Sequence, residues 1–234
     1  MKRLLVLAGM LLCLVAPMTA LAQGVHLNWG GCGPSGASDN AFACNNNTAL
    51  HQMVSSFNAP PGITHFIGAT SEILVAGQAP LGPWWALQAG GCRTGALSSE
   101  DPSALVLGDC STATFDGSTN LGLANYEPNY LGNPNQGRIT TDMARSDAGV
   151  PLVAGNEYQA NVIQLRSTKT TGGTACLGCL DPVTVRTIRV FVAQPTGAVE
   201  LQGNGGGCAA WRGSTGCVVS TRRQSWGEVK SLYR

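Results

Sequence analysis

The chain has 234 residues with 14 basic and 13 acidic side chains, and only 12% of its residues are charged. This balance lacks the basic excess that nucleic-acid binders and proteins held on anionic membrane surfaces need. Glycine (31 residues) and proline (12 residues) are abundant, and they favour short strands joined by many tight turns over helices.

Residues 1–22 have the pattern of a signal peptide. Two basic residues precede an apolar run that is too short to span a membrane, and Ala20-Leu21-Ala22 offers the small residues that a signal peptidase requires. A lipoprotein site at Cys13 is the weaker alternative, because bulky leucines precede it and a better cleavage site follows. We expect cleavage before Gln23 and a secreted or periplasmic protein, with residues 23–234 forming one domain without an integral membrane segment.

Eight cysteines remain once Cys13 leaves with the signal peptide, and an even number in an exported chain predicts disulfide bonds. Spacing alone cannot decide among the combinations, but the eight fall into four local couples, each of which brackets Gly- or Ser-rich sequence. Pairing within the couples is the simplest hypothesis. The predicted disulfides are Cys32–Cys44, Cys92–Cys110, Cys176–Cys179 and Cys208–Cys217.

The segment Cys176-Leu-Gly-Cys179 also has two functional interpretations, a thiol-redox pair and part of a zinc site. A redox pair of the thioredoxin type needs a helix that starts at its first cysteine, and Asp181-Pro182 with the β-branched run after it does not supply one. A zinc site needs two further ligands, for which Cys208 and Cys217 are the candidates. An oxidising compartment favours a structural disulfide over both.

Residues 157–166 and 182–192 are two β-rich runs on either side of a Gly/Thr-rich loop, a pattern that predicts a long antiparallel hairpin. Both faces of the second run are partly apolar, which places it inside a two-layer structure. Other predicted strands cover residues 25–29, 50–57, 63–76, 103–107, 138–145 and 198–202, with a long surface loop from 112 to 137. The predicted fold is an all-β antiparallel sandwich, Ig-like or jelly-roll-like, with disulfide-closed loops.

Trp84 and Trp85 are the aromatic residues that bear most directly on binding. If they lie on a strand, one faces the core and the other faces outward or into the second layer. An exposed tryptophan beside Asn- and Gly-rich loops would suit stacking on a sugar ring, so both are candidate binding residues. The alternative, which the pattern favours, is that both fill core space.

The last residues of the chain change to a helical period. Ser225 and Glu228 fit a capping box at the start of a short helix over about 225–233. Its apolar residues lie three to four apart and share one face: Trp226, Val229, Leu232 and Tyr233. A helix this short is marginal alone, so this face must dock on something, either as a structural cap or as an attachment or sorting element.

The side chains that could carry chemistry form no known motif. His26, His51 and His65 are scattered without metal-ligand spacing. The carboxylates that could pair as in a glycosidase are Glu72, Glu100, Asp101, Asp109 and Asp116. Solvated loop carboxylates are the favoured interpretation of these residues. Asp116-Gly-Ser-Thr-Asn120 offers oxygens for calcium but breaks the EF-hand pattern, and no other cofactor is indicated.

Several segments of the mature chain resemble a family of exported, disulfide-containing bacterial proteins without an assigned activity. They are GVHLNWGGCG near the mature start, FACNNN, PWW followed by GGCR, CLGC, and the ending SWGEVKSLYR. The resemblance implies export, paired cysteines and a β-sandwich similar to cohesin-like or other carbohydrate-associated modules. It implies no catalytic residue, and a likeness of fold by itself supports no function.

The missing catalytic constellation, the predicted disulfides and the long loops favour binding over catalysis. The leading hypothesis is an exported, non-enzymatic module that binds a protein or polymer partner or serves in an envelope or surface assembly. The alternative is a hydrolase that acts on extracellular carbohydrate. Paired carboxylates in a cleft would favour the hydrolase, whereas an aromatic strip without paired acids would favour a glycan or protein partner.

Overall fold

The structure is a computed structural model that describes residues 24–100, 110–111, 114–115, 120–203, 207–214 and 217. The predicted signal peptide, the predicted strand at 103–107 and the predicted C-terminal helix with Ser225 and Glu228 lie outside the described residues. Asp101, Asp109 and most of the candidate calcium segment also lie outside them. Within the described ranges, no helix has the length and apolar character needed to cross a membrane.

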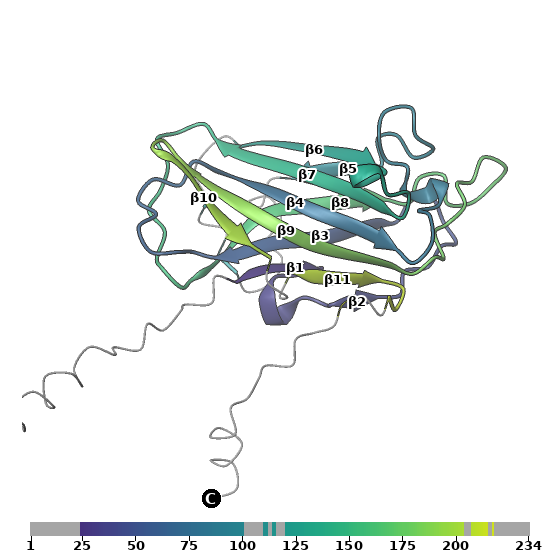
Figure 1. Cartoon of the computed structure of the whole chain (residues 1–234), viewed down its shortest axis with the longest axis horizontal. Coiled ribbons are helices and arrows are strands. Elements are labelled where there is room, and N and C mark those ends of the chain that lie inside the picture. Colours follow the sequence, from purple (N-terminus) through teal and green to yellow (C-terminus); the bar gives the residue numbers. More distant parts are fainter. Residues whose placement is uncertain are drawn as a thin grey trace, which may run out of the picture.

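The described strands form two sheets that pack against each other (Figure 1). Their bounds are β1 Val25–Trp29, β2 Asp39–Asn40, β3 Leu50–Asn58, β4 Gly68–Gly77, β5 Leu97–Glu100, β6 Asn120–Pro128, β7 Gln136–Arg145, β8 Glu157–Arg166, β9 Val183–Gln194, β10 Gly197–Gln202 and β11 Cys208–Trp211. The four-stranded sheet has the order β1-β3-β8-β5, and the seven-stranded sheet has the order β2-β11-β9-β4-β7-β6, with β10 paired to β9. All pairs are antiparallel except the short pair β2–β11. The predicted all-β sandwich is confirmed.

The predicted central hairpin is wrong, because β8 and β9 belong to different sheets. β8 lies between β3 and β5, and β9 lies between β4 and β11. The loop 167–182 therefore crosses from one sheet to the other. A hairpin and a connection between two sheets have the same sequence pattern, two β-rich runs around a turn-rich loop. Only the strands with which each run pairs distinguish the two arrangements.

The register of β9 explains why both of its faces carry apolar residues. Its pairing with β4 shifts by one residue at Ile188, which has no residue of β4 opposite it. Such a β-bulge moves the following side chains to the other face of the strand. Four valines are consequently buried in the core, two before the bulge and two after it: Val183, Val185, Val190 and Val192.

Two local expectations also differ from the structure. The stretch 112–137, expected as a surface loop, contains β6 at the edge of the seven-stranded sheet. Its Gly- and Asn-rich sequence is typical of a loop and does not predict a strand. An edge strand tolerates such residues because only one side of it is paired. Trp84 and Trp85 lie on the 3-10 helix η2 (Pro83–Trp85) and not on a strand.

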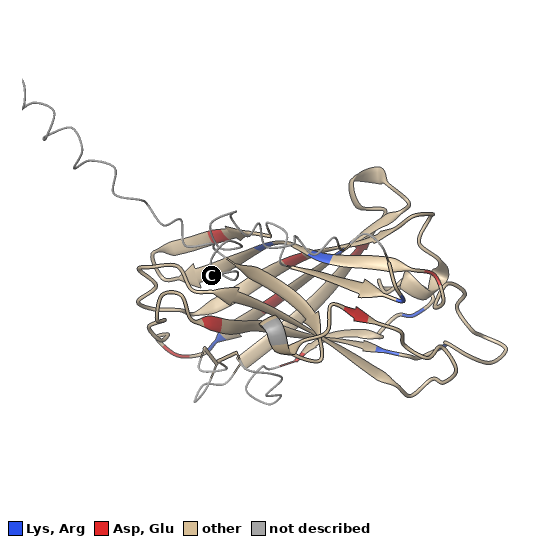
Figure 2. Cartoon of the chain, turned by 90° about the horizontal axis from the view of Figure 1, so that it is seen from below, with Lys and Arg blue, Asp and Glu red and all other residues tan. Residues whose placement is uncertain are grey.

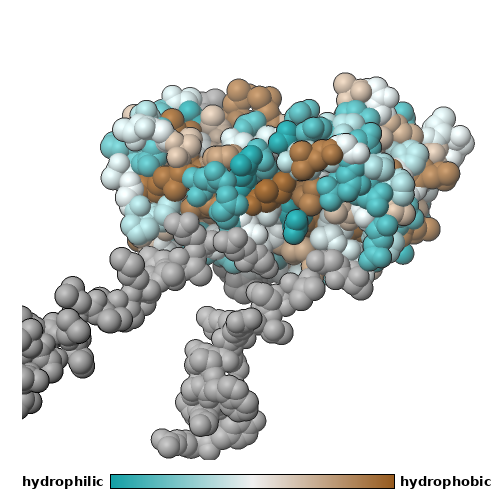
Figure 3. Space-filling view, viewed as in Figure 1, coloured by the Kyte–Doolittle hydropathy of each residue, from teal (hydrophilic) through white to brown (hydrophobic). Residues whose placement is uncertain are grey.

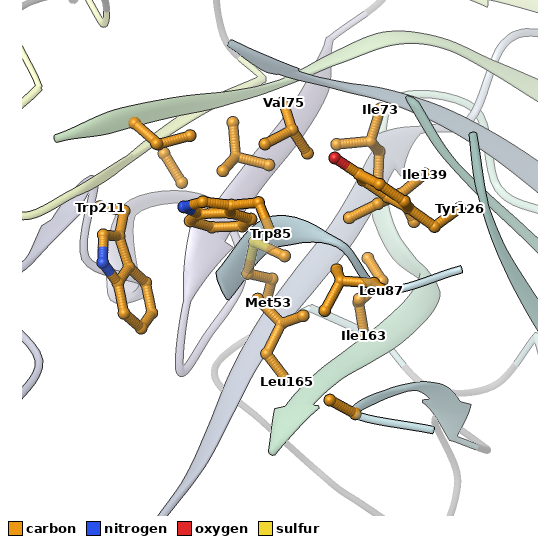
Figure 4. Close-up of a cluster of buried hydrophobic side chains, with 14 of the residues drawn as sticks. Met53, Ile73, Val75, Trp85, Leu87, Tyr126, Ile139, Ile163, Leu165 and Trp211 are labelled. Carbon is orange, nitrogen blue, oxygen red and sulfur yellow. The ribbon is translucent and has the colours of Figure 1, made fainter. Parts of the chain in front are cut away.

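Two apolar clusters fill the space between the sheets, and Figure 4 shows the first of them, around Met53 and Trp85. A layer of fully buried polar side chains lies between the clusters, one each on β3, β4, β7 and β8: Ser55, Ser71, Thr141 and Asn161. The Oγ atoms of Ser55 and Ser71 are 3.0 Å apart, and the Asn161 amide donates to Ser71 at 3.0 Å. These bonds compensate part of the cost of burying polar groups at the centre of the core.

Three of the four predicted disulfides are wrong. The disulfides of the structure are Cys32–Cys110, Cys44–Cys179, Cys92–Cys176 and Cys208–Cys217. The last is as predicted. The local pairs Cys32–Cys44, Cys92–Cys110 and Cys176–Cys179 are not formed.

The physical reason is that the two-layer fold brings loops together that are far apart in the sequence. After Cys32 the chain does not turn back toward Cys44 as a closed loop, because Ala37 bridges to Trp29 and β2 then pairs with β11. The three long-range disulfides have Cα–Cα distances of 5.8 to 6.0 Å, within the usual range. Four disulfides indicate a protein of an oxidising compartment.

A chain of alternating charges crosses the outer face of the seven-stranded sheet. Its successive N···O distances are 2.8, 3.7, 3.0 and 3.5 Å, from β6 through β7, β4 and β9 to β10: Glu127, Arg138, Glu72, Arg189 and Glu200. Hydrophilic side chains gather over the middle of this face (Figure 3), and charged residues are otherwise sparse on the strands (Figure 2). The charges on this face are therefore largely satisfied within the sheet.

Candidate functional site

Two disulfides clamp three loops together at one end of the sandwich. Cys44 and Cys92 come from two separate loops and are bonded to Cys179 and Cys176 of the loop between β8 and β9. The side-chain oxygen of Asn47 accepts two backbone hydrogen bonds from the same loop, at 2.7 and 2.9 Å. These bonds hold the three loops in one arrangement, so the clamped end offers a surface that is ordered before any partner binds.

Trp84 and Trp85 belong to the clamped loop between β4 and β5 and are buried, with exposed fractions of 0% and 1%. The expectation that one of them faces outward as a sugar-stacking residue is wrong, and the core-filling alternative is confirmed. Successive side chains of a 3-10 helix are separated by about 120° and not by the 180° of a strand. Two adjacent tryptophans on η2 can therefore both enter the core.

Trp211 on β11 is the centre of an aromatic cluster at this end, and Figure 4 shows it beside one member of the cluster, Trp85. Its ring centroid lies 4.5 to 5.7 Å from those of five other rings: Trp29, Phe42, His51, Trp84 and Trp85. Its Nε1 donates a hydrogen bond of 2.7 Å to the carbonyl oxygen of Cys179. The cluster therefore connects the core to the disulfide-bonded loop.

Arg93 is buried beside the cluster, with no acidic partner among the described residues. Its guanidinium stacks on Trp84 at 3.5 Å and donates to the backbone carbonyl oxygens of Trp84, Arg166 and Thr168. Burial lowers the pKa of Arg93 to about 9, so the group is still a cation at neutral pH. These contacts join two loops through their backbones, which is a structural role.

His51 and Ser167 form a pair whose composition is that of a base and a nucleophile. The Nε2 atom of His51 lies 2.8 Å from the Oγ atom of Ser167. Both side chains are buried, Phe42 and Trp211 pack on the imidazole, and neither His51 nor Ser167 lines a described pocket. Desolvation, and then the charge of Arg93, lower the pKa of His51 to about 4. The imidazole is therefore neutral and enclosed at physiological pH, and we assign the pair a structural role.

Lowering the pH should destabilise the protein through His51. The imidazole titrates near 6.5 in the unfolded chain and near 4 in the folded chain, so the unfolded state binds the proton first as the pH falls. Stability is therefore fully present above pH 6.5 and is lost progressively toward pH 4, by about 3 kcal/mol. Urea unfolding at pH 7 and pH 4 should show a pH dependence about 3 kcal/mol smaller in His51→Gln. An equal pH dependence in both proteins would contradict this assignment.

The motif cysteines Cys176 and Cys179 are each bonded to a cysteine outside the motif, so the redox-pair interpretation is wrong. The zinc alternative also fails, because its four thiolates are consumed in disulfides, including Cys208–Cys217. Among the residues that the structure describes, no cluster of three or more His, Cys, Asp or Glu residues could hold a metal ion.

An apolar pocket of about 400 Å³ opens at the clamped end. Its walls are residues 77–82 from the end of β4 onward, residues 181–183 leading into β9, Trp85 and Gly213. The pocket thus lies where β4, β9 and β11 meet the clamped loops, and it has the size of a small ligand site.

Two glycines hold the walls of this pocket close together. A Cβ atom added to Gly82 would lie 2.9 Å from the Cα atom of Gly178. Gly178 itself has a φ of 106°, a backbone conformation open to glycine. A larger residue at either position would push the two loops apart and change the shape of the pocket.

Two polar groups of the pocket have no partner among the residues that the structure describes. Asp181 is the only charged residue in the lining, and its carboxylate has no hydrogen-bond or ion-pair partner among the described residues. The Nε1 atom of Trp85 is buried and has no hydrogen-bond partner in the described part of the chain. Figure 4 shows this nitrogen on the edge of the ring nearest to Trp211. A cation would complement the carboxylate, and a hydrogen-bond acceptor would complement the indole.

Two leucines of the disulfide-bonded loop are exposed beside the pocket, Leu177 by 76% and Leu180 by 62%. Leu180 precedes the pocket residue Asp181, and the carbonyl oxygen of Leu177 accepts a 2.8 Å hydrogen bond from the backbone N–H of Trp84. Apolar side chains held in solvent on a fixed loop are typical of an interaction surface.

A second pocket of about 270 Å³ shares Leu81, Gly82 and Trp85 with the first. It extends to the loop between β6 and β7, whose Pro134 carbonyl oxygen accepts a 3.0 Å hydrogen bond from the Leu81 N–H. Leu131 of that loop is 83% exposed and has a φ of 54°, which leucine rarely adopts. The apolar surface therefore continues from the clamped loops to the loop between β6 and β7.

The other candidates predicted from the sequence lie elsewhere. Glu72 belongs to the ion-pair chain, and Glu100 ends β5. His26 and His65 each contact a neighbouring polar side chain. None of these four residues lines either pocket.

Sequence reasoning missed Leu177, Leu180 and Asp181. The available signal was the segment CLGCLDP, in which two leucines stand beside cysteines in an otherwise polar loop.

Neither a protein-family model nor a curated protein matches the chain. Similar solved structures include a chain of a mutant type II cohesin–X-dockerin complex from Acetivibrio cellulolyticus and the second type II cohesin module of an adaptor scaffoldin from the same organism. The sequence identities are 10% and 11%, and both TM-scores are 0.33. The matches cover 76% of this chain and 90% and 83% of the other two. These are loose likenesses between β-sandwiches.

Proposed function

We propose that this protein is an exported, non-catalytic module that binds a protein partner through the clamped end of its sandwich. The observation that carries the proposal is the exposure of Leu177 and Leu180 beside an apolar pocket, on a loop fixed by two disulfides. Desolvation of the leucines and of the pocket walls would drive association with an apolar segment of the partner. Because the loop is already ordered, little entropy is lost on binding.

The chemistry of this end favours a protein over a polysaccharide. Sugar rings stack on exposed aromatic side chains that have polar neighbours. The four tryptophans of the described chain are buried, with exposed fractions of 2% or less: Trp29, Trp84, Trp85 and Trp211. The large exposed side chains beside the pocket are aliphatic, which suits an apolar protein surface.

The Leu177→Ser, Leu180→Ser double variant should bind the partner at least about tenfold more weakly, because each leucine contributes on the order of 1 kcal/mol at the centre of an interface. The partner is captured from envelope and culture fractions on the immobilised oxidised protein, identified, purified and titrated. The matched control is Leu121→Ser, Leu123→Ser on β6, where the two leucines are 66% and 60% exposed. This control should bind like the unchanged protein.

Two results would contradict the proposal. One is an equal loss of binding in both double variants, which would extend the interface to β6 at the edge of the seven-stranded sheet. The other is binding to a purified glycan on an array with no captured protein, which would favour the carbohydrate alternative.

A further inference from the structure

We propose that residues 218–234 of this chain dock on the pocket beside Asp181 and occupy it while no partner is bound. The pocket and the segment complement each other in charge, in reach and in apolar surface. Docking of the segment needs no partner and is independent of the proposed function. Only its displacement by a partner rests on that function.

The charges of the chain are divided between its body and its C-terminal segment. Residues 24–217 contain eight basic and twelve acidic side chains, a net charge of −4. Residues 218–234 contain four basic side chains and one acidic side chain, a net charge of +3. Asp181, the one charged residue of the pocket lining, is acidic and unpaired among the described residues. A basic segment is thus attracted to the body and finds a free carboxylate at the pocket.

The covalent attachment of the segment places it within reach of the pocket. Cys217 is bonded to Cys208 at the start of β11, and Gly213 of the pocket follows the end of that strand. β11 is about 10 Å long, whereas the seven residues 218–224 span up to about 24 Å when extended. The predicted helix at 225–233 can therefore lie over the pocket without strain in the connection.

The apolar face of the segment needs a contact that the pocket can supply. A helix of this length is not stable in water unless the face formed by Trp226, Val229, Leu232 and Tyr233 is covered. A pocket of about 400 Å³ accommodates one or two such side chains. The exposed Leu177 and Leu180 extend the apolar contact beyond the pocket.

Attachment to the same chain favours this occupant over a free peptide of equal affinity. A short connection gives the segment an effective concentration in the millimolar range at the pocket. A partner must then displace the segment, so binding would be weaker than the intrinsic affinity of the open pocket.

The test is the ¹H–¹⁵N NMR spectrum of the full mature chain, residues 23–234, without any partner. The five tryptophans give five indole N–H signals, among them Trp85 in the pocket and Trp226 in the segment. In the variant Val229→Ser, Leu232→Ser, we expect shifted signals for the Trp85 indole and for the amides of residues 77–82. The amides of β10, at the other end of the sandwich (Figure 1), should not shift. The matched control Gln224→Ala, Ser231→Ala changes the segment outside its apolar face and should leave the pocket signals in place.

The reciprocal variant Asp181→Asn should shift the indole signal of Trp226, although the two residues are far apart in the sequence. Unchanged pocket signals in Val229→Ser, Leu232→Ser would overturn the proposal. It would also be overturned if unlabelled full chain, added to the labelled variant, restored the pocket signals, because the segment would then dock on a second copy. The NMR test contains no partner. A failure of docking would therefore overturn this inference alone, whereas a failure of partner capture would count against the proposed function.

Discussion

Replacing Cys44 and Cys179 together by alanine should lower the free energy of unfolding by about 4 kcal/mol. The two residues are 135 positions apart, but the other long-range disulfides shorten the connection between them. With those bonds intact, the shortest covalent path from Cys44 to Cys179 follows the chain from 44 to 32, from 110 to 92 and from 176 to 179, and crosses two disulfides between these segments. The Cys44–Cys179 bond therefore closes a loop of about 35 residues. The chain entropy that this loop removes from the unfolded state corresponds to about 4 kcal/mol.

The Cys208→Ala, Cys217→Ala variant is the matched control, because it removes a disulfide that spans nine positions. Its loss should be about 2.5 kcal/mol on the same chain-entropy relation. Guanidinium unfolding of the oxidised proteins, followed by circular dichroism, gives both values. Equal losses in the two variants would show that loop length does not govern the contribution of these bonds.

Trp211→Ala should lower the free energy of unfolding by about 4 kcal/mol, the typical cost of removing a fully buried tryptophan. The substitution leaves a cavity among five neighbouring rings and an unpaired carbonyl oxygen at Cys179. Trp211→Phe keeps a ring but not the donor, and should lose clearly less. Leu123→Ala, at a side chain that is 60% exposed, should change stability by no more than about 0.5 kcal/mol.

Trp211 and the disulfide at Cys179 should also be energetically coupled. The indole of Trp211 bonds the backbone of Cys179, so releasing that loop weakens the same contact. A double-mutant cycle between Trp211→Ala and the pair Cys44→Ala, Cys179→Ala should show a coupling of at least about 0.5 kcal/mol. Additive losses would mean that the clamped loop and the aromatic cluster are independent.

The fold class was accessible from the sequence because it depends on local patterns. The Gly and Pro content, the alternation in 25–29 and the β-rich runs around 50–57, 138–145 and 198–202 each predict strands that the structure contains. Strand partners were not accessible, since the same run can pair in either layer. β8 and β9, for example, lie in different sheets although their sequences predict a hairpin. The bulge at Ile188 was not predicted either, because its only sign in the sequence is that both faces of the run are partly apolar.

The site was less predictable than the fold. Cys44 and Cys92 reach the loop at 176–179 through contacts between distant loops, which no spacing rule contains. A strand would direct one of Trp84 and Trp85 outward, whereas the 3-10 helix that begins at Pro83 directs both into the core, as the favoured interpretation of the sequence has it. The pocket depends on the close approach of Gly82 and Gly178, a tertiary feature with no local sequence pattern.

The disulfide connectivity also constrains how the protein can be produced. In an unordered chain, cysteines close in sequence meet most often, so early oxidation favours Cys32–Cys44 and Cys176–Cys179. Neither bond is present in the native protein. Both must be opened by thiolate exchange before the sheets can close over the correct pairs. We therefore expect an isomerase to raise the yield of native protein, and a host that oxidises thiols without reshuffling them to accumulate mispaired chains.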